Sequence, residues 1–247
     1  MNEITPRVVS WFSCGNASAT ATVKALEKYG YVQAVYCRVI EEHEDNLRFI
    51  VDFTKATGIP IEIITNEKHG GSIYSVFEAR KFIKNQYGAP CTMELKRDMR
   101  KQYQLPTDIQ ILGFTSEEGD RIDSFIDANN EVNADFILSD LGINKEACHQ
   151  FIADLGIPMP VMYQLGYQNN NCIGCVKGGM GYFNKIRKDF PVQFNKLAVL
   201  ERKLGFAINK DKNGMVFLDQ LDPNRGNYKD DAPAVCGFVC EHTPTIL

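Results

Sequence analysis

Cysteine pairs are the residues of this sequence whose spacing most directly indicates chemistry. Cys172 and Cys175 are separated by two residues, and Cys236 and Cys240 are separated by three. Each pair places two thiols within about one turn of chain, as a zinc ion or an iron–sulfur cluster requires of a local segment. Zinc fingers and ribbons separate such pairs by about 12 to 20 residues, whereas 60 residues lie between Cys175 and Cys236. The spacing alone leaves both zinc and an iron–sulfur cluster open.

The composition is typical of globular proteins and excludes several classes. The 247 residues are 44% hydrophobic and 23% charged, with 27 Lys and Arg against 31 Asp and Glu. This balance excludes a uniformly basic surface, so that contact with nucleic acid would need a local patch. No apolar run approaches the roughly 18 residues of a membrane span, and the first residues lack the pattern of a signal peptide. We therefore expect a cytoplasmic protein without membrane contact, whose eight cysteines are thiols or metal ligands rather than disulfides.

Short apolar runs alternate with helical patterns over the first two thirds of the chain. This alternation predicts parallel strand pairing, and hence an α/β fold with a Rossmann-like, doubly wound, mainly parallel sheet. The expected strands are residues 7–12, 32–39, 61–64 and 109–114, followed by a further apolar segment at 136–138.

Helical spacing and cap residues predict the helices between these strands. The first helix should end at Gly30, and Asn144 should cap a helix that buries Cys148. Other helical patterns cover residues 41–53, with three glutamates at the front, and residues 74–82 and 92–103. Cys37, inside an expected strand, should also be buried.

The pattern changes near residue 166, which predicts two parts. Residues 1–165 are expected to form an α/β domain, and residues 166–247 a Cys-rich, mostly helical extension packed on it. The extension should contain a helix that begins at Pro191 and a hairpin that turns at residues 212–214.

The loop after the first strand has the composition of a phosphate site. A Gly-containing turn at a helix N-terminus presents main-chain N–H groups and the positive end of the helix dipole, and Ser13 and Ser18 add hydroxyl groups. In open parallel sheets, ligands bind beyond the carboxyl ends of the strands, where this loop should lie. A Ser-capped helix after an ordinary turn is the alternative interpretation.

Three segments resemble one known family. The loop Ser13-Cys14-Gly15-Asn16-Ala17-Ser18 resembles the Ser-Gly-Gly-x-Asp-Ser pyrophosphate loop of the adenine nucleotide alpha hydrolases, in the branch of the phosphoadenylyl-sulfate reductases, with Cys14 in place of Gly and Ala17 in place of Asp. The segment that begins at Cys91 is similar to the family's Cys-Cys/Thr-x-x-x-Lys, and the segment from Gly166 to Cys175 to its Gly-Tyr-x-x-x-x-Cys-x-x-Cys. The resemblance covers residues 7–190.

This resemblance implies a site for ATP or a related adenylyl nucleotide. The family would approach adenine at the end of the second strand, and its cations would hold phosphate or sulfate oxygens. Lys96 and Arg121 are the candidate catalytic cations, with solvated surface charge as the alternative. The segment after residue 113 is similar to the family's Gly-x-x-x-x-Glu-x-x-x-Arg, which favours Arg121. The candidate nucleotide-binding residues are Ser13, Cys14, Gly15, Asn16, Ala17, Ser18, Arg38, Val39 and Gly113.

The resemblance also shifts the cysteine interpretation from zinc toward a [4Fe-4S] cluster. Reductases of this family bind their cluster through an early Cys-Cys and a later Cys-x-x-Cys, and here Thr92 replaces the second early cysteine. Four thiolates would then be Cys91, Cys172 and Cys175 with one of Cys236 and Cys240, or the two late pairs without Cys91. Whichever of Cys236 and Cys240 is not a ligand would be available as a nucleophile, and Cys240 is the candidate catalytic cysteine.

Three functions remain open at this point. The first is an ATP pyrophosphatase that adenylates an acceptor and couples this to sulfur transfer or nucleic-acid modification, with Mg²⁺ as a further candidate cofactor and tRNA, DNA or a sulfur donor as candidate partners. The second is a sulfonucleotide reductase with a carboxyl-terminal cysteine nucleophile. The third is a nucleotide-binding module without catalysis. A homodimer is one assembly compatible with each.

A basic segment from Lys177 to Lys188 that contains Tyr182 and Phe183 is either a surface for nucleotide or nucleic acid or the solvated face of a helix.

Overall fold

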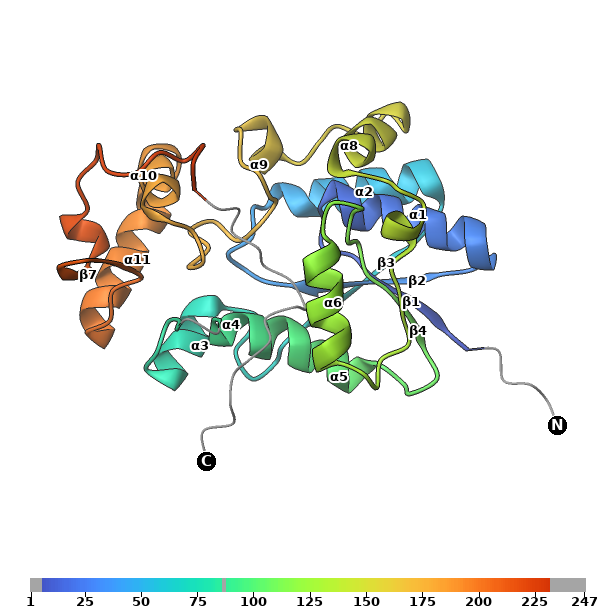
Figure 1. The fold of residues 1–247 in the computed structure, drawn as a ribbon, viewed down its shortest axis with the longest axis horizontal. Coiled ribbons are helices and arrows are strands. Elements are labelled where there is room, and N and C mark those ends of the chain that lie inside the picture. The colour runs from blue at the N-terminus through green and yellow to red at the C-terminus, as the bar shows by residue number, and fades with distance from the viewer. Residues whose placement is uncertain (1–5, 86–87, 232–247) are drawn as a thin grey trace. The chain divides into compact units, whose positions relative to one another are not determined.

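The computed structural model describes residues 6–85 and 88–231, and Figure 1 shows its helices and strands. The chain divides into two compact units whose segments alternate along the sequence. Unit 1 comprises Met1–Arg38, His43–Asn66 and Asp98–Asn170, and unit 2 comprises Val39–Glu42, Glu67–Arg97 and Asn171–Leu247. The functional division into residues 1–165 and 166–247 stays a prediction. Among the described residues, no helix is both long and apolar enough to cross a membrane.

Unit 1 contains a five-stranded sheet in the order β3-β2-β1-β4-β5. Every neighbouring pair is parallel. The order reverses direction at β1, from which the chain first adds β2 and β3 on one side and then β4 and β5 on the other. The predicted Rossmann-like, doubly wound α/β fold is therefore confirmed. The strands are β1 (Val8–Trp11), β2 (Gln33–Arg38), β3 (Ile61–Thr65), β4 (Ile109–Ile111) and β5 (Ala134–Asp135).

Helices cover both faces of this sheet (Figure 1). On one face, α1 and α8 pack through an apolar cluster that includes Phe12, Phe49 and Ile152, all at most 2% exposed. On the other face, the Trp11 ring meets Tyr103 edge-on at 5.8 Å, and Phe114 packs against Phe125. The helices of unit 1 are α1 (Asn16–Tyr29), α2 (Asp45–Thr57), α5 (Asp98–Tyr103), α6 (Gly119–Ala128), α7 (Ile137–Asp140), α8 (Lys145–Asp154) and α9 (Val161–Gln164).

Unit 2 is mostly helical. Its longest helix, α11, packs on α10, and Leu197 of α11 lies against the turn at Gly174. The buried carboxylate of Glu201 accepts N–H bonds from Ile208 at 2.5 Å and Leu218 at 2.6 Å, which attaches the following hairpin to α11. The elements are α3 (Ile73–Arg80), α4 (Pro90–Thr92), the π-helical turn η1 (Met93–Arg97), α10 (Met180–Asp189), α11 (Pro191–Leu204), β6 (Asn209–Asp211), β7 (Gly214–Val216) and the 3-10 turn η2 (Leu218–Gln220).

Local signals in the sequence predicted several element ends correctly. Gly30 ends α1 with φ of 76°, a left-handed conformation that glycine adopts without a Cβ clash. The Asn144 side chain accepts the N–H of Ala147 at 2.8 Å and so caps α8, on which Cys148 is fully buried. Cys37 is buried in β2. The hairpin turns at residues 212–213 between β6 and β7, and a helix begins at Pro191, both as predicted.

Two predicted helices differ in the structure, and the apolar segment at 136–138 lies at the start of a helix. The apolar run at 136–138 begins the short helix α7, and strand β5 precedes it. The helix expected over 92–103 contains the π-turn at 93–97. The helix expected from residue 41 begins at Asp45, since the Glu41 carboxylate instead accepts the Ser72 hydroxyl and the N–H of Ile73 at the start of α3.

Candidate functional site

The loop between β1 and α1 is held by one serine hydroxyl. Ser18 Oγ accepts the main-chain N–H and the hydroxyl of Ser13, each at 3.0 Å. The same hydroxyl donates to the carbonyl oxygen of Gly15 at 2.9 Å. Ser18 is 5% exposed and its bond to Gly15 is buried, whereas Ser13 is exposed to solvent. The two serines that the sequence singled out thus lie in contact and shape the start of α1.

Gly113 brings the end of β4 against this loop. A Cβ on Gly113 would lie 2.7 Å from Ser18 Cα and 2.8 Å from Ser18 N, which are main-chain atoms that cannot move aside. Only glycine therefore allows this approach. The loop and Gly113 follow β1 and β4, the neighbouring strands at which the sheet order reverses, and ligands of open α/β sheets bind at such a point.

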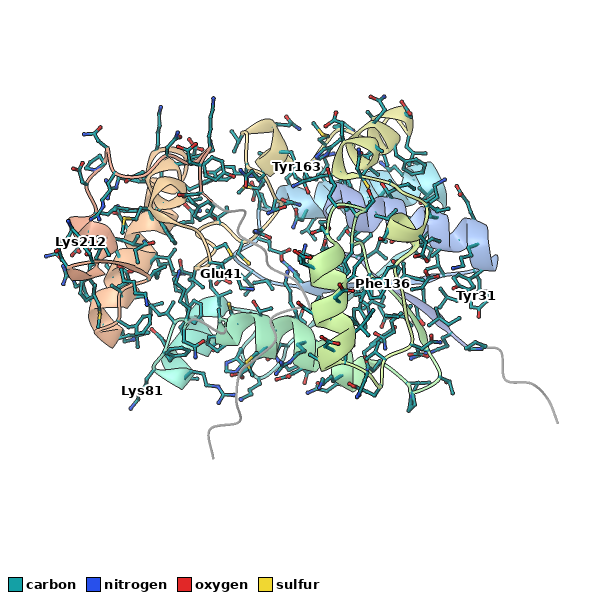
Figure 2. The ribbon with its side chains drawn as sticks, in the orientation of Figure 1. Tyr31, Glu41, Lys81, Phe136, Tyr163 and Lys212 are labelled. Atoms are coloured by element: carbon teal, nitrogen blue, oxygen red, sulfur yellow. The ribbon has the colours of Figure 1, made fainter. Side chains whose placement is uncertain are left out.

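A tyrosine hydroxyl lies at the N-terminus of α1. Tyr163, labelled in Figure 2, has its hydroxyl 3.2 Å from the position of a Cβ on Gly15. Desolvation raises the pKa of Tyr163 to about 12, while the main-chain N–H groups of Asn16 and Asn170 lower it. The phenol oxygen thus lies beside the helix start, where an anion would bind. The Asn170 side chain donates to the Cys14 carbonyl at 2.7 Å and to Asn46 Oδ1 at 2.7 Å, and so fastens the loop.

Tyr163→Phe should destabilise the protein. The ring would still pack against His149, but the phenol oxygen beside the main-chain N–H groups of Asn16 and Asn170 would be lost. Losing a polar interaction of this kind costs about 0.5–1.5 kcal/mol, and chemical denaturation of the variant and the wild type measures the difference. An unchanged free energy of unfolding would contradict this role of the hydroxyl.

Cys14, which stands where the Ser-Gly-Gly-x-Asp-Ser pattern has Gly, is fully buried with φ of 57°. This left-handed conformation costs a non-glycine residue about 1 kcal/mol. Its thiol contacts the Asn46 carbonyl oxygen at 3.9 Å. Cys14 therefore has a packing role within the loop, and its main chain has the conformation that a glycine would adopt.

Charged side chains gather on the segments after β4 and at the start of α8. Arg121, a predicted catalytic residue, pairs with Glu118 and lies 4.7 Å above the Phe114 ring. Lys145 donates to the Gln168 carbonyl oxygen and to Asn169 Oδ1. Burial lowers the pKa of Lys145, and the charge of Arg121 lowers it further while Glu117 opposes this. Arg121 lies on α6 and Lys145 begins α8. Their positive charges could attract an anion.

Sequence reasoning missed Lys145, His149, Tyr163 and Asn170. His149 directly follows the buried Cys148, and its Nδ1 lies 2.7 Å from Asn16 Nδ2 in the loop. No local pattern pairs these residues with a loop more than a hundred positions earlier.

Arg38 ends β2 and is exposed, and Val39 is buried as the first residue of unit 2, so their role near adenine stays a prediction. Ala17 lies in the first turn of α1.

In unit 2, a tyrosine hydroxyl holds the Cys172–Cys175 turn. The Tyr182 hydroxyl accepts the N–H groups of Gly174 at 3.1 Å and Cys175 at 2.9 Å, and donates to the Cys172 carbonyl oxygen at 3.3 Å. Gly174 has φ of 80°, and the two cysteines are 7% and 6% exposed. Both cysteines therefore lie in one buried turn held by hydrogen bonds, which suits half of a four-thiolate metal site.

The rest of a metal site does not appear within the described part of the chain. Residues 6–85 and 88–231 contain no group of three or more His, Cys, Asp or Glu side chains arranged to hold a metal ion. Cys91 is partly buried in α4, also in unit 2. Cys236 and Cys240, the other predicted ligands, and the predicted nucleophilic role of Cys240 lie outside the described residues. The cluster therefore stays a prediction.

Lys96, the other predicted catalytic cation, lies on the π-turn and is buried against a carboxylate. Its Nζ is 2.8 Å from Glu42 Oε1, with Lys96 9% and Glu42 7% exposed. Single π-turns inside helices are frequent at functional sites. On the same turn, Glu94 binds His69 Nε2 at 2.6 Å, and His69 Nδ1 lies 3.2 Å from Ser75 Oγ. These contacts fasten the π-turn to α3 within unit 2.

The basic segment of α10 is occupied by internal contacts. Tyr182 and Phe183 are 5% and 0% exposed and belong to the core of unit 2, so neither ring is available to stack on a base. Lys185 pairs with Asp189 at 2.8 Å. Arg187 donates to main-chain carbonyl oxygens of η2 and its neighbour. Of the two interpretations, the amphipathic helix fits these contacts.

No family model matches the sequence, and no curated protein matches it. Among solved structures, the phosphoadenylyl-sulfate (PAPS) reductase from Candida auris, in its phosphate complex, is similar with a TM-score of 0.47 and 11% sequence identity. The match covers 67% of this chain and 80% of that chain. The fold class of the present chain follows from its own strand order and parallel pairing.

Proposed function

We propose that this protein is an enzyme that binds ATP or a related adenylyl nucleotide at the phosphate loop, which we define as residues 13–18. The observation that carries the proposal is the close contact of Gly113 with Ser18 where the sheet order reverses. This contact places a serine-containing loop and the start of a fourteen-residue helix at the carboxyl edge of the sheet. Main-chain N–H groups, the Ser13 hydroxyl and the helix dipole would bind phosphate oxygens there.

The proposed reaction is adenylation of an acceptor. An acceptor oxygen attacks the α-phosphorus of ATP, a new P–O bond forms, and the bond to the β-phosphate breaks with release of pyrophosphate. The chain's own contribution would be to orient the phosphates and to stabilise the leaving pyrophosphate with N–H groups and with cations such as Lys145 and Arg121. Mg²⁺ would neutralise further phosphate charge, the acceptor would be tRNA or DNA, and a sulfur donor would be a further partner.

The same proposal includes a [4Fe-4S] cluster, for which Cys172 and Cys175 would supply two of the four thiolates. The turn held by Tyr182 supports it, because both thiols are preset and shielded from water. When bound, such a cluster supplies thiolate-ligated iron for the transfer of sulfur or electrons. Iron and sulfide analysis after anaerobic purification tests the cluster, and a colourless protein with one tightly bound zinc ion would contradict it.

Nucleotide binding is tested by calorimetry with ATP, AMP, adenosine 3′,5′-bisphosphate and pyrophosphate. Ser18→Ala should weaken ATP binding about tenfold or more, because the loop loses bonds worth about 0.5–1.5 kcal/mol each. Ser124→Ala is the matched control, since that hydroxyl is exposed on α6 and bonds only within its helix. Equal ATP affinity for wild type and Ser18→Ala would contradict the assignment of the loop.

Product analysis separates the three functions. Pyrophosphate and AMP released from ATP support adenylation. Sulfite released from a sulfonucleotide in the presence of a thiol reductant instead supports the reductase. Tight ATP binding without any product, unchanged by added tRNA, DNA or sulfonucleotide, supports the non-catalytic module.

A further inference from the structure

His149 makes a direct contact with the first residue of α1. Its Nδ1 lies 2.7 Å from Asn16 Nδ2. Asn16 is only 1% exposed, and its second polar atom, Oδ1, has no hydrogen-bond partner within the described part of the chain. Buried amide oxygens are normally paired. This unsatisfied atom therefore lies within the phosphate loop, on the first residue of α1.

The chemistry of the two groups determines the direction of the hydrogen bond. An amide nitrogen only donates, so the Nδ1 of His149 accepts and the ring is neutral, with its proton on Nε2. Burial lowers the pKa of His149, and the charge of Lys145 lowers it further. The neutral ring is thus the stable form at neutral pH, and it keeps the Asn16 amide with Nδ2 toward the imidazole.

Protonation of His149 would reverse this arrangement. A proton on Nδ1 turns the ring nitrogen into a donor that faces the Asn16 NH₂ group, another donor. Rotation of the amide by half a turn relieves the conflict, because Oδ1 then accepts from Nδ1. The NH₂ group takes the place where the unpaired oxygen was. A donor then replaces an acceptor at the helix start, where a phosphate oxygen needs a donor.

We infer that His149 is a positioning residue of the phosphate loop, which acts by rotating the Asn16 amide so that a bound phosphate meets Nδ2 instead of Oδ1. In this assignment Nε2 keeps its proton, so that binding of a phosphate group to the loop takes up one proton from solvent, on His149 Nδ1. The inference rests on the proposed binding of a nucleotide at residues 13–18. It identifies the residue that makes this binding depend on pH.

The groups around His149 are compatible with this assignment. On its own helix, Lys145 disfavours and Glu146 favours the protonated ring. From α9, Tyr163 meets the ring edge-on with centroids 5.0 Å apart, and it stays neutral because its pKa is about 12. The thiol of Cys148 is also neutral, since burial raises its pKa. A phosphate dianion at the loop would add a negative charge, which favours the protonated ring.

NMR tests the coupling in the ligand-free protein. His149 should titrate below its ordinary pKa of about 6.5, and the Asn16 side-chain NH₂ signals should shift with the same apparent pKa. Comparison with His149→Asn and Asn16→Ser assigns the signals. An Asn16 NH₂ group whose signals do not follow the His149 titration would overturn the inference without affecting the proposed function.

Calorimetry tests the linked proton. ATP is titrated into wild type, His149→Asn and Gln150→Ala in two buffers of different ionisation enthalpy, above the pKa of His149. Asparagine keeps an amide oxygen near the position of Nδ1 but does not titrate, and Gln150 is an exposed neighbour on α8. We expect proton uptake for wild type and Gln150→Ala and none beyond ATP's own titration for His149→Asn.

The ATP affinity should depend on pH for the same reason. As the pH falls, the ATP affinity of the wild type should rise, in total by about tenfold for each unit by which binding raises the His149 pKa. His149→Asn should lack this rise. Equal proton uptake by wild type and His149→Asn would overturn the role of His149 while ATP binding stands. Absence of ATP binding at every pH, with Asn16 and His149 still titrating together, would overturn the nucleotide proposal and keep the coupling.

Discussion

Gly113→Ala is expected to lower the free energy of unfolding by about 1–3 kcal/mol, the usual range for overpacking a closely packed site. It should also weaken ATP binding more than any single loss of a hydroxyl group in the phosphate loop. The added methyl group would lie 2.7 Å from Ser18 Cα and 3.1 Å from the carbonyl carbon of Ala17. Since both belong to the main chain at the start of α1, the strand end and the helix must move apart. Denaturation and calorimetry with ATP measure the two effects.

Gly119→Ala is the matched control for this substitution. Gly119 begins α6, and a Cβ there would meet no atom within 4 Å. Alanine favours a helix over glycine by about 1 kcal/mol, so this variant should be as stable as wild type or slightly more stable. The interpretation of Gly113 would be wrong if both variants behaved alike.

Tyr182→Phe should have the second large effect. The Tyr182 hydroxyl accepts two N–H bonds from the Cys172–Cys175 turn and donates a third bond to the Cys172 carbonyl oxygen. Phenylalanine would leave the two buried N–H groups unpaired, at a cost of about 1–3 kcal/mol. The turn would lose the geometry that presets both thiols, so anaerobic reconstitution should yield less bound iron per chain.

Tyr74→Phe is the matched control for Tyr182→Phe, because both tyrosines belong to unit 2. The Tyr74 hydroxyl is buried with no hydrogen-bond partner among the described residues. Its removal should therefore leave stability unchanged or raise it, because no hydrogen bond is lost and a desolvated polar atom disappears. If Tyr74→Phe and Tyr182→Phe destabilised the protein equally, the hydroxyl of Tyr182 would have no special role in the turn.

Both predictions concern places where a glycine allows a close main-chain arrangement and side-chain hydroxyl or amide groups bind the main chain. At the phosphate loop, glycine permits the approach of β4, while Ser18 and Asn170 bind the chain between β1 and α1. At the cysteine turn, glycine with a left-handed φ and a tyrosine hydroxyl perform the corresponding roles. Preset main-chain geometry of this kind lowers the reorganisation needed when a ligand binds.

The sequence by itself determined the features that depend on neighbouring residues. Alternation of apolar runs and helical patterns predicted the parallel α/β sheet, and Gly30 and Asn144 marked the ends of helices through backbone conformation and capping. Ser13 and Ser18 were recognised from composition at a predicted strand-to-helix turn. These signals are readable because each involves residues within a few positions of one another.

Only the tertiary structure decided the partners of these residues. The pairing of Asn16 with His149 joins positions 133 apart, and Lys96 meets Glu42 across 54 positions. The Glu41 carboxylate, expected at the front of one helix, binds the start of another. Helical periodicity and cap residues carry no information about such contacts, because they form only when the sheet brings distant segments to one edge or the core packs one helix on another.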